Sequence, residues 1–227
     1  MKKYLNPWLT IYPQFILKIF IVINIIAIFC YPGGTYIDHN TNGYSISQNF
    51  LSDLGRTISF SNEINFLSSQ LFNMSIIMAG TIFIYFYINI RKIFISNNQI
   101  ILGLLGSFFG VLGGISLMGV GLTPSNIYLD MHILFATWLF RFFLIASICY
   151  SIIIFIDKKF PNKYAGGYLF FTLSILLYIL ISELGPDPKT NLLSLSIQVI
   201  SQKFILIIFL FAVYIQTLGV QILASNE

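Results

Sequence analysis

Charged residues are scarce in this 227-residue chain. Asp, Glu, Lys and Arg together make up 9% of it, whereas hydrophobic residues make up 57%. A water-soluble domain carries about 25% charged residues. This deficit excludes a soluble globular protein and favours a protein whose surface faces lipid. The length allows a single domain over residues 1–227.

Cysteine and histidine are scarcer still. Cys30 and Cys149 are the only cysteines, and both lie inside apolar runs, which excludes a disulfide scaffold and a cysteine-based zinc site. A catalytic zinc site takes three protein ligands. His39 and His132 would therefore need a carboxylate beside them, and no H-E-x-x-H spacing supports such a site. We expect no metal and no other cofactor.

The chain also lacks a cluster of basic residues. Its formal charge is +4, but its Lys and Arg residues stand singly or in pairs, mostly at the ends of apolar runs. This distribution is typical of charge that flanks a membrane, and it does not indicate a nucleic-acid partner. We expect membrane lipids to be the partners of this protein.

Long apolar runs are abundant. A helix needs about 20 apolar residues to cross the hydrocarbon of a bilayer, and six runs approach or exceed that length. We therefore expect an all-α polytopic membrane protein, a bundle of six transmembrane helices with one long external loop at 32–65. The predicted helices are 15–31, 66–90, 100–122, 131–156, 164–182 and 193–223.

The short loops predict an orientation, because cytoplasmic loops carry an excess of Lys and Arg. Seven basic residues flank one side of the predicted membrane and two flank the other. They are Lys2, Lys3, Arg91, Lys92, Lys158, Lys159 and Lys163 on the first side, and Arg56 and Lys189 on the second. We expect a protein of the cell membrane with both termini in the cytoplasm.

Polar residues interrupt three of the predicted spans on the side of the 32–65 loop. In each span they share one helical face, because most are spaced by three, four or seven residues. The faces are Asn65, Ser69 and Asn73 in the second span, Asp130, Thr137 and Arg141 in the fourth, and Ser194, Gln198, Ser201 and Gln202 in the sixth. By the same spacing, His132 points away from the face of Arg141. We predict a polar cavity lined by these three helices, above an apolar half of the bundle.

Two basic side chains lie deep inside predicted spans. Arg141 follows Asp130 by eleven residues, which places it about 16 Å along the helix, and Lys203 lies at a similar depth. Charges at that depth face the interior of a bundle and find partners. Two cations also repel each other, so they need an anion beside them. Asp53 and Glu183 are the protein candidates, and a bound phosphate or carboxylate is the alternative.

The long loop at 32–65 carries apolar anchors around a charged residue. Phe50, Leu51 and Leu54 are apolar, and Asp53 between them needs a partner. We expect the loop to pack on the bundle and to cover the polar cavity. Gly55 is expected to adopt a backbone conformation that other residues avoid.

Glycine recurs every fourth residue in the third span, at Gly106, Gly110 and Gly114. Small residues at this spacing let another helix approach closely. We interpret them as packing positions within the bundle, with a homodimer through the third helix as the alternative.

Several motifs resemble a bacterial and archaeal membrane family known as domain-of-unknown-function family 998. They are Y-P-G-G-T at 31–35, G-Y-S at 43–45, N-F-L-S-D-L-G at 49–55, the glycines leading to Pro124, and His132 at the start of the fourth helix. The resemblance covers most of the chain and implies a six-helix protein. It gives emphasis to Ser52, Asp53, Gly55 and His132, but it implies no known reaction.

The core Ser52-Asp53-x-Gly55 is also similar to that of the Frag/DRAM/Sfk membrane proteins. Some of these are linked to lipid remodelling and to the regulation of membrane lipids. This similarity extends over only a few residues. It implies a lipid-related role without naming a substrate.

Two functional hypotheses follow. The first is a protein that binds, or modifies, a lipid or an anionic headgroup in its external cavity. Its candidate catalytic residues are Asp53, His132 and Glu183, and its candidate binding residues are Arg141, Lys203, Asp53, Ser52, Asn73, Gln198 and Gln202. The second is a small transporter or structural membrane protein in which the same charges form an internal ion-pair network.

Overall fold

The computed structural model describes residues 6–94, 96–157, 159–160 and 162–225. In this part of the chain the regular structure is helical. Six long helices make up most of it: α1 (Ile11–Cys30), α2 (Phe66–Ile90), α3 (Asn97–Leu122), α4 (Leu129–Ile156), α5 (Asn162–Leu184) and α6 (Leu192–Ser225). Each is long and apolar enough to span a membrane. The prediction of six candidate spans is confirmed, with bounds that agree to within four residues.

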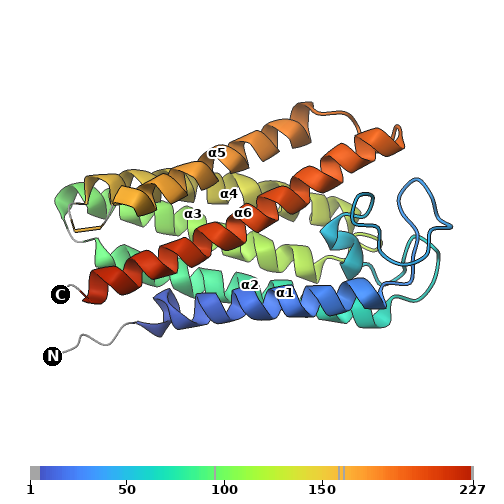
Figure 1. The fold of residues 1–227 in the computed structure, drawn as a ribbon, viewed down its shortest axis with the longest axis horizontal. Coiled ribbons are helices and arrows are strands. Elements are labelled where there is room, and N and C mark those ends of the chain that lie inside the picture. Colours follow the sequence, from blue (N-terminus) through green and yellow to red (C-terminus); the bar gives the residue numbers. More distant parts are fainter. Residues whose placement is uncertain (1–5, 95, 158, 161, 226–227) are drawn as a thin grey trace.

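The helices run antiparallel in chain order and form a ring. Each packs against the next along the chain, and α6 also packs against α1, which closes the ring. Figure 1 shows the long loop between α1 and α2 at one end of the bundle, with the start of α1 and the end of α6 toward the other. We call these the loop end and the opposite end.

Glycines bring α3 close to both of its neighbours. A Cβ at Gly110 would overlap the ring of Tyr87 on α2, and a Cβ at Gly113 would lie 2.7 Å from the ring of Phe143 on α4. Gly106 faces Tyr150 and Gly114 faces Ile84 in the same way. The predicted packing role is confirmed, because these glycines are covered within the chain. The homodimer through this helix stays a prediction.

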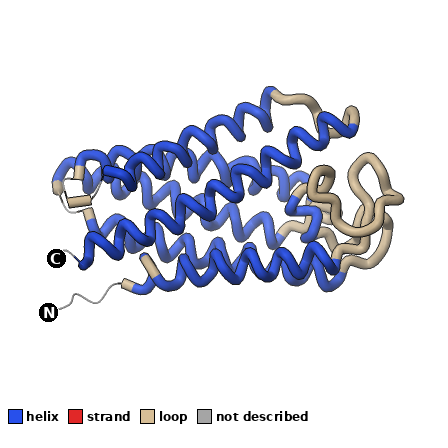
Figure 2. The backbone as a smooth tube through the Cα atoms, in the orientation of Figure 1, coloured by secondary structure: helices blue, strands red, loops and turns tan. Residues whose placement is uncertain are grey.

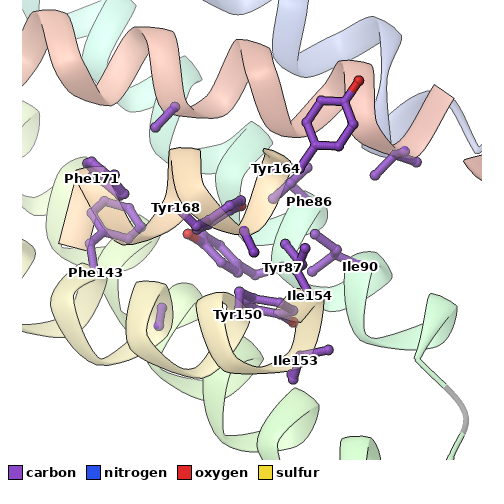
Figure 3. Packing of buried hydrophobic residues seen from close by; sticks show 14 of the residues in the cluster. Phe86, Tyr87, Ile90, Phe143, Tyr150, Ile153, Ile154, Tyr164, Tyr168 and Phe171 are labelled. Atoms are coloured by element: carbon purple, nitrogen blue, oxygen red, sulfur yellow. The ribbon is translucent and has the colours of Figure 1, made fainter. Parts of the chain in front are cut away.

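The half of the bundle near the opposite end has a closed aromatic core. Tyr87, Tyr150 and Tyr168 from three helices are buried there with aliphatic side chains of α2 and α4 (Figure 3). The Tyr150 hydroxyl lies 2.7 Å from Ser107 Oγ. Tyr150 and Ser107 are thus bonded to each other in tightly packed surroundings, whereas the buried Tyr168 hydroxyl has no hydrogen-bond partner among the described residues.

At the loop end, a folded loop covers the ends of the helices. The segment between α1 and α2 folds back over the bundle (Figure 2) and contains the short 3-10 helix η2 (Leu51–Gly55). Leu54 is fully buried, which confirms that the loop packs on the bundle. Gly34, at φ +80°, has the backbone of Phe60 and Ser61 where a Cβ would be.

Gly55 does not adopt the unusual backbone conformation that the sequence analysis predicts. Positive φ values occur at Gly33, Gly34 and Gly43, but not at Gly55. A Cβ at Gly55 would instead overlap the Asn73 side chain and lie 2.7 Å from the ring of Phe72. Glycine is needed here because η2 lies directly against α2.

Candidate functional site

A polar pocket of about 230 Å³ lies between α4, α5, α6 and the loop. Its charged and polar lining comes from Ser52, His132, Thr137, Arg141, Ser182, Glu183 and Gln202. The pocket is therefore at the loop end, as the sequence predicts, but its third wall is α5. The prediction that α2 lines it is wrong.

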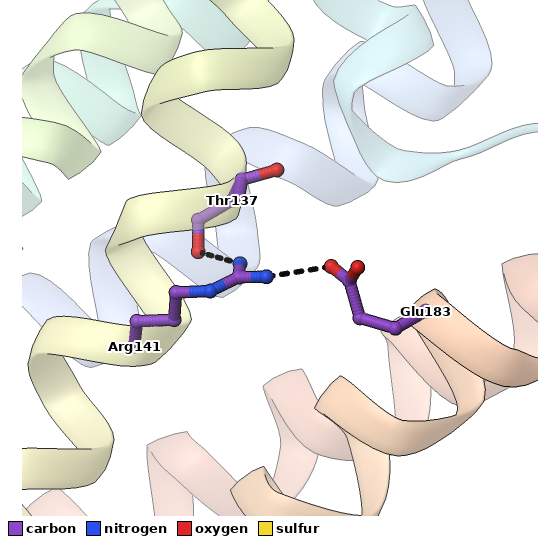
Figure 4. A network of polar contacts seen from close by, with 3 residues as sticks. All are labelled: Thr137, Arg141 and Glu183. Atoms are coloured by element: carbon purple, nitrogen blue, oxygen red, sulfur yellow. Dashed lines mark hydrogen bonds and ion pairs between the residues drawn. The ribbon is translucent and has the colours of Figure 1, made fainter.

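Arg141 and Glu183 form an ion pair at this pocket (Figure 4). Arg141 Nη2 donates to Glu183 Oε1 at 2.7 Å, and Nη1 donates to the carbonyl of Thr137 at 3.0 Å. The Arg141 side chain is 31% exposed and that of Glu183 is 49% exposed. An arginine has five N–H donors, so these two bonds leave donors that can hold a further acceptor.

His132 and Arg141 both line this pocket. The two residues are nine apart, which spaces them by two and a half turns, but the pocket is wide enough to extend over both. His132 Nδ1 lies 2.7 Å from the carbonyl of Thr123. Because a carbonyl only accepts, Nδ1 carries the hydrogen of this bond.

Gln202 is held by the loop. Its Oε1 accepts a hydrogen bond of 2.9 Å from the backbone N–H of Leu51. This bond fixes which end of the amide faces the loop and leaves the amide NH₂ as a donor. Gln202 and Ser52 thus supply two polar groups where the loop meets α6.

A second, apolar cavity of about 120 Å³ adjoins the polar pocket. All six helices contribute to its lining, and it extends from Leu51 and Ser52 toward the middle of the bundle. Its aromatic lining includes Phe83, Phe143, Phe171 and Phe209, whose rings contact one another. Ser52, His132, Ala136, Phe140 and Gln202 line both compartments.

Lys203 does not face Arg141. Its Nζ donates to the carbonyl of Asn49 at 2.5 Å and lies 5.3 Å from the centre of the Tyr44 ring. Lys203 therefore anchors the loop to α6 in this structure. The two cations therefore do not meet in one pocket, and each has its own predicted anion: Arg141 pairs with Glu183, and Lys203 interacts electrostatically with Asp53.

Asp53 is a buried residue of the loop itself, in η2. Asn49 Nδ2 donates to its Oδ2 at 3.3 Å. Burial raises the pKa of Asp53 from 3.8 to about 6, against the opposing effects of Arg56, of hydrogen bonds and of Lys203. Asp53 lies outside both cavity linings, so its position fits a role in the loop better than one in catalysis.

The polar face of α2 binds the loop. Asn65 Nδ2 donates to the carbonyls of Leu54 and Arg56, and Asn73 Nδ2 donates to the carbonyl of Gly55. These side chains satisfy the free carbonyls at the end of η2. Asn73 was predicted to bind a ligand, but its amide NH₂ donates to the backbone of the loop, and its Oδ1 is buried without a hydrogen-bond partner in the described part of the chain.

Gln198 has a similar role at the end of α5. Its Nε2 donates to the carbonyls of Ile181 and Pro186. Sequence reasoning grouped Gln198 with the binding residues and missed Thr123, Ser182, Tyr178 and Phe140. Of these, Ser182 and Tyr178 precede Glu183 by one and by five residues, and this spacing was the available signal.

Within the described residues, no three His, Cys, Asp or Glu side chains gather in a way that could hold a metal ion. His39 packs against Phe60 in the loop, with ring centres 6.1 Å apart.

Comparisons with protein-family models, with curated proteins and with solved structures give no match to this chain. Membership of family 998 stays a prediction. The functional argument therefore depends on the geometry of the two compartments.

Proposed function

We propose that this chain is a multi-pass cell-membrane protein that binds a lipid at its loop end. The observation that carries the proposal is the shared lining of the two compartments. Ser52, His132, Ala136, Phe140 and Gln202 border both the charged pocket and the apolar cavity. A polar space that opens onto an apolar one suits an amphiphile, with its headgroup in the first and its chain in the second.

The polar pocket supplies groups that hold an anion. Arg141 has free N–H donors, and guanidinium binds phosphate and carboxylate with directed, charge-assisted hydrogen bonds. Arginine inside a membrane-spanning helix is costly unless it has a function or a partner. Glu183 satisfies part of this requirement, and a bound headgroup would satisfy the rest.

The apolar cavity fits one slender chain. Its volume of about 120 Å³ is close to that of an engineered apolar cavity that binds benzene, about 150 Å³. This is room for part of one hydrocarbon chain. A second chain of a diacyl lipid would stay in the bilayer.

We place the loop end outside the cell. The excess of basic residues at the opposite end favours cytoplasmic termini, with Arg91, Lys92, Lys159 and Lys163 in the described part of the chain. Lys2, Lys3 and Lys158 lie outside the described residues. A reporter fused after residue 227 should be active only in the cytoplasm, and activity only outside it would overturn this orientation.

Blocking the junction tests the proposed function. Ala136 lines both compartments, so Ala136→Phe should place a ring where the chain passes between them. Native mass spectrometry of protein purified in mild detergent should detect bound lipid on the unaltered chain and little on Ala136→Phe. Leu177→Phe is the control, because Leu177 is 56% exposed on the outside of α5. Equal lipid on all three proteins would refute the proposal.

The bond between Arg141 and Glu183 favours a second candidate function, a small transporter or structural protein with an ion-pair network. In that case both charges serve to form the ion pair and do not bind a ligand. Arg141→Gln would then reduce stability and leave lipid retention unchanged. Loss of lipid without loss of stability is the opposite result, and it supports lipid binding.

A further inference from the structure

We infer that the lipid headgroup is zwitterionic, with a phosphate held by Arg141 and an ammonium group held by Glu183. This inference rests on the proposed function and names the class of its ligand. It refines the sequence-based expectation of a lipid or an anionic headgroup.

The charges that line the polar pocket are balanced. Arg141 and Glu183 are the two residues of its lining that bear a full charge at neutral pH by their type, one of each sign. Lys203 contacts the loop at Asn49, and Asp53 is buried within the loop, in η2. A purely anionic headgroup at Arg141 would therefore lie close to the Glu183 carboxylate, without the second cation that the sequence suggested.

Hydrogen-bonding capacity remains on both partners. Arg141 uses one N–H for Thr137 and one for Glu183, which leaves three of its five donors. The Glu183 carboxylate receives the bond from Arg141 on Oε1, and a carboxylate has about four lone-pair sites. The pair can thus accept a phosphate on one side and an N–H donor on the other.

The spacing of the pair also suits such a headgroup. Arg141 Nη2 and Glu183 Oε1 are 2.7 Å apart. In an ethanolamine phosphate, a two-carbon linker keeps the ammonium close to the phosphate, so one headgroup can contact both residues. The primary ammonium of ethanolamine offers charged N–H donors to Glu183. A glycerol headgroup offers only uncharged hydroxyls in their place.

A competition between two lysolipids tests the inference. Lysophosphatidylethanolamine and lysophosphatidylglycerol with the same palmitoyl chain differ only in the headgroup. Native mass spectrometry with equal amounts of both should show at least a fivefold preference of the unaltered protein for the ethanolamine lipid. Glu183→Gln should reverse the preference, because Arg141 then faces no carboxylate. Arg141→Gln should weaken the binding of both lipids.

Asp187→Asn is the matched control. It removes the same charge from an exposed site in the α5–α6 connection, outside the pocket lining, and it should keep the preference. Equal binding of both lysolipids, or an unchanged ratio in Glu183→Gln, would overturn the inference while lipid binding itself still stands. If neither lysolipid binds and Ala136→Phe changes no copurified lipid, the proposed function fails and the inference fails with it.

Discussion

The two halves of the bundle use their polar residues differently. Near the opposite end, Tyr87 and Tyr150 are fully enclosed, and Ser107 bonds with Tyr150 inside the core. Near the loop end, Arg141 and Glu183 remain partly exposed beside a pocket, and Gln202 holds the loop at the edge of a cavity. The same six helices thus form a closed core in one half and an open space in the other.

This difference in packing indicates that the loop end is the functional half of the bundle. Protein interiors are packed as densely as organic crystals, with few voids larger than a water molecule. The aromatic half shows that this chain can reach such packing. The cavities at the loop end therefore result from the side chains that line them, not from loose packing of the whole chain. The charged residues in the lining are groups that a ligand can bind.

Breaking the closed half should have the largest effect. Gly110→Leu would force a side chain into the ring of Tyr87, which is buried. We expect a loss of about 3 kcal/mol or more in the free energy of unfolding, the upper part of the range for overpacked cores. Denaturant unfolding in detergent measures it.

Gly166→Leu is the control for that change. A Cβ at Gly166 has no atom within 4 Å, so its substitution should shift the unfolding free energy by less than about 1 kcal/mol. Equal destabilisation by the two variants would contradict the close packing of α3 against α2.

The titration of Asp53 should make the free energy of unfolding depend on pH. Its folded pKa of about 6 lies above its ordinary value of 3.8, so the folded state binds the proton more tightly. The resulting stability is fully present below about pH 4 and is lost as pH rises through 6, by up to about 3 kcal/mol. Asp53→Asn should lack this decline when unfolding is followed from pH 4 to 7.5. Parallel profiles for the two proteins would contradict the burial of Asp53 in η2.

Displacing the loop should have a smaller effect. Gly55→Ala would push η2 away from Asn73 and Phe72, at a cost of about 1 to 3 kcal/mol. Protease added from the loop side should then cut residues 44–56 faster than in the unaltered protein. Asn40→Ala, in an exposed turn, is the control and should not change cleavage. A resistant Gly55→Ala protein would contradict direct packing of η2 on α2.

Removing Arg141 should change stability least. Its pair with Glu183 is partly exposed, and exposed pairs contribute about 0 to 1 kcal/mol. Arg141→Gln should therefore unfold within about 1 kcal/mol of the unaltered protein while its copurified lipid falls severalfold. A large loss of stability with lipid retained would favour the structural ion-pair network.

Much of the fold follows from the sequence, because a span needs about 20 apolar residues and little else competes for such a run. The glycine spacing in α3 likewise predicts close packing. The site was predicted only in part. Arg141 and Glu183 do meet, as expected for a charge inside an apolar helical run that needs a partner.

The errors have a common physical cause. Helical spacing shows which residues share a face, but not whether that face meets a cavity or a loop. The amides of Asn73 and Gln198 bind free carbonyls at the ends of η2 and α5, and Lys203 binds Asn49. These partners depend on how the chain folds back, which local periodicity does not encode.

The most direct test of the central claim is where a lipid chain goes. We would bind a lysophosphatidylethanolamine that carries a diazirine at the end of its chain, irradiate, and map the labelled residues by mass spectrometry. The account predicts labelling of cavity residues such as Phe209 or Phe143, and loss of that labelling in Ala136→Phe. Labelling confined to residues on the outer surface of the bundle, such as Phe204 and Phe211, which are 61% and 64% exposed on the same helix as Phe209, would contradict it.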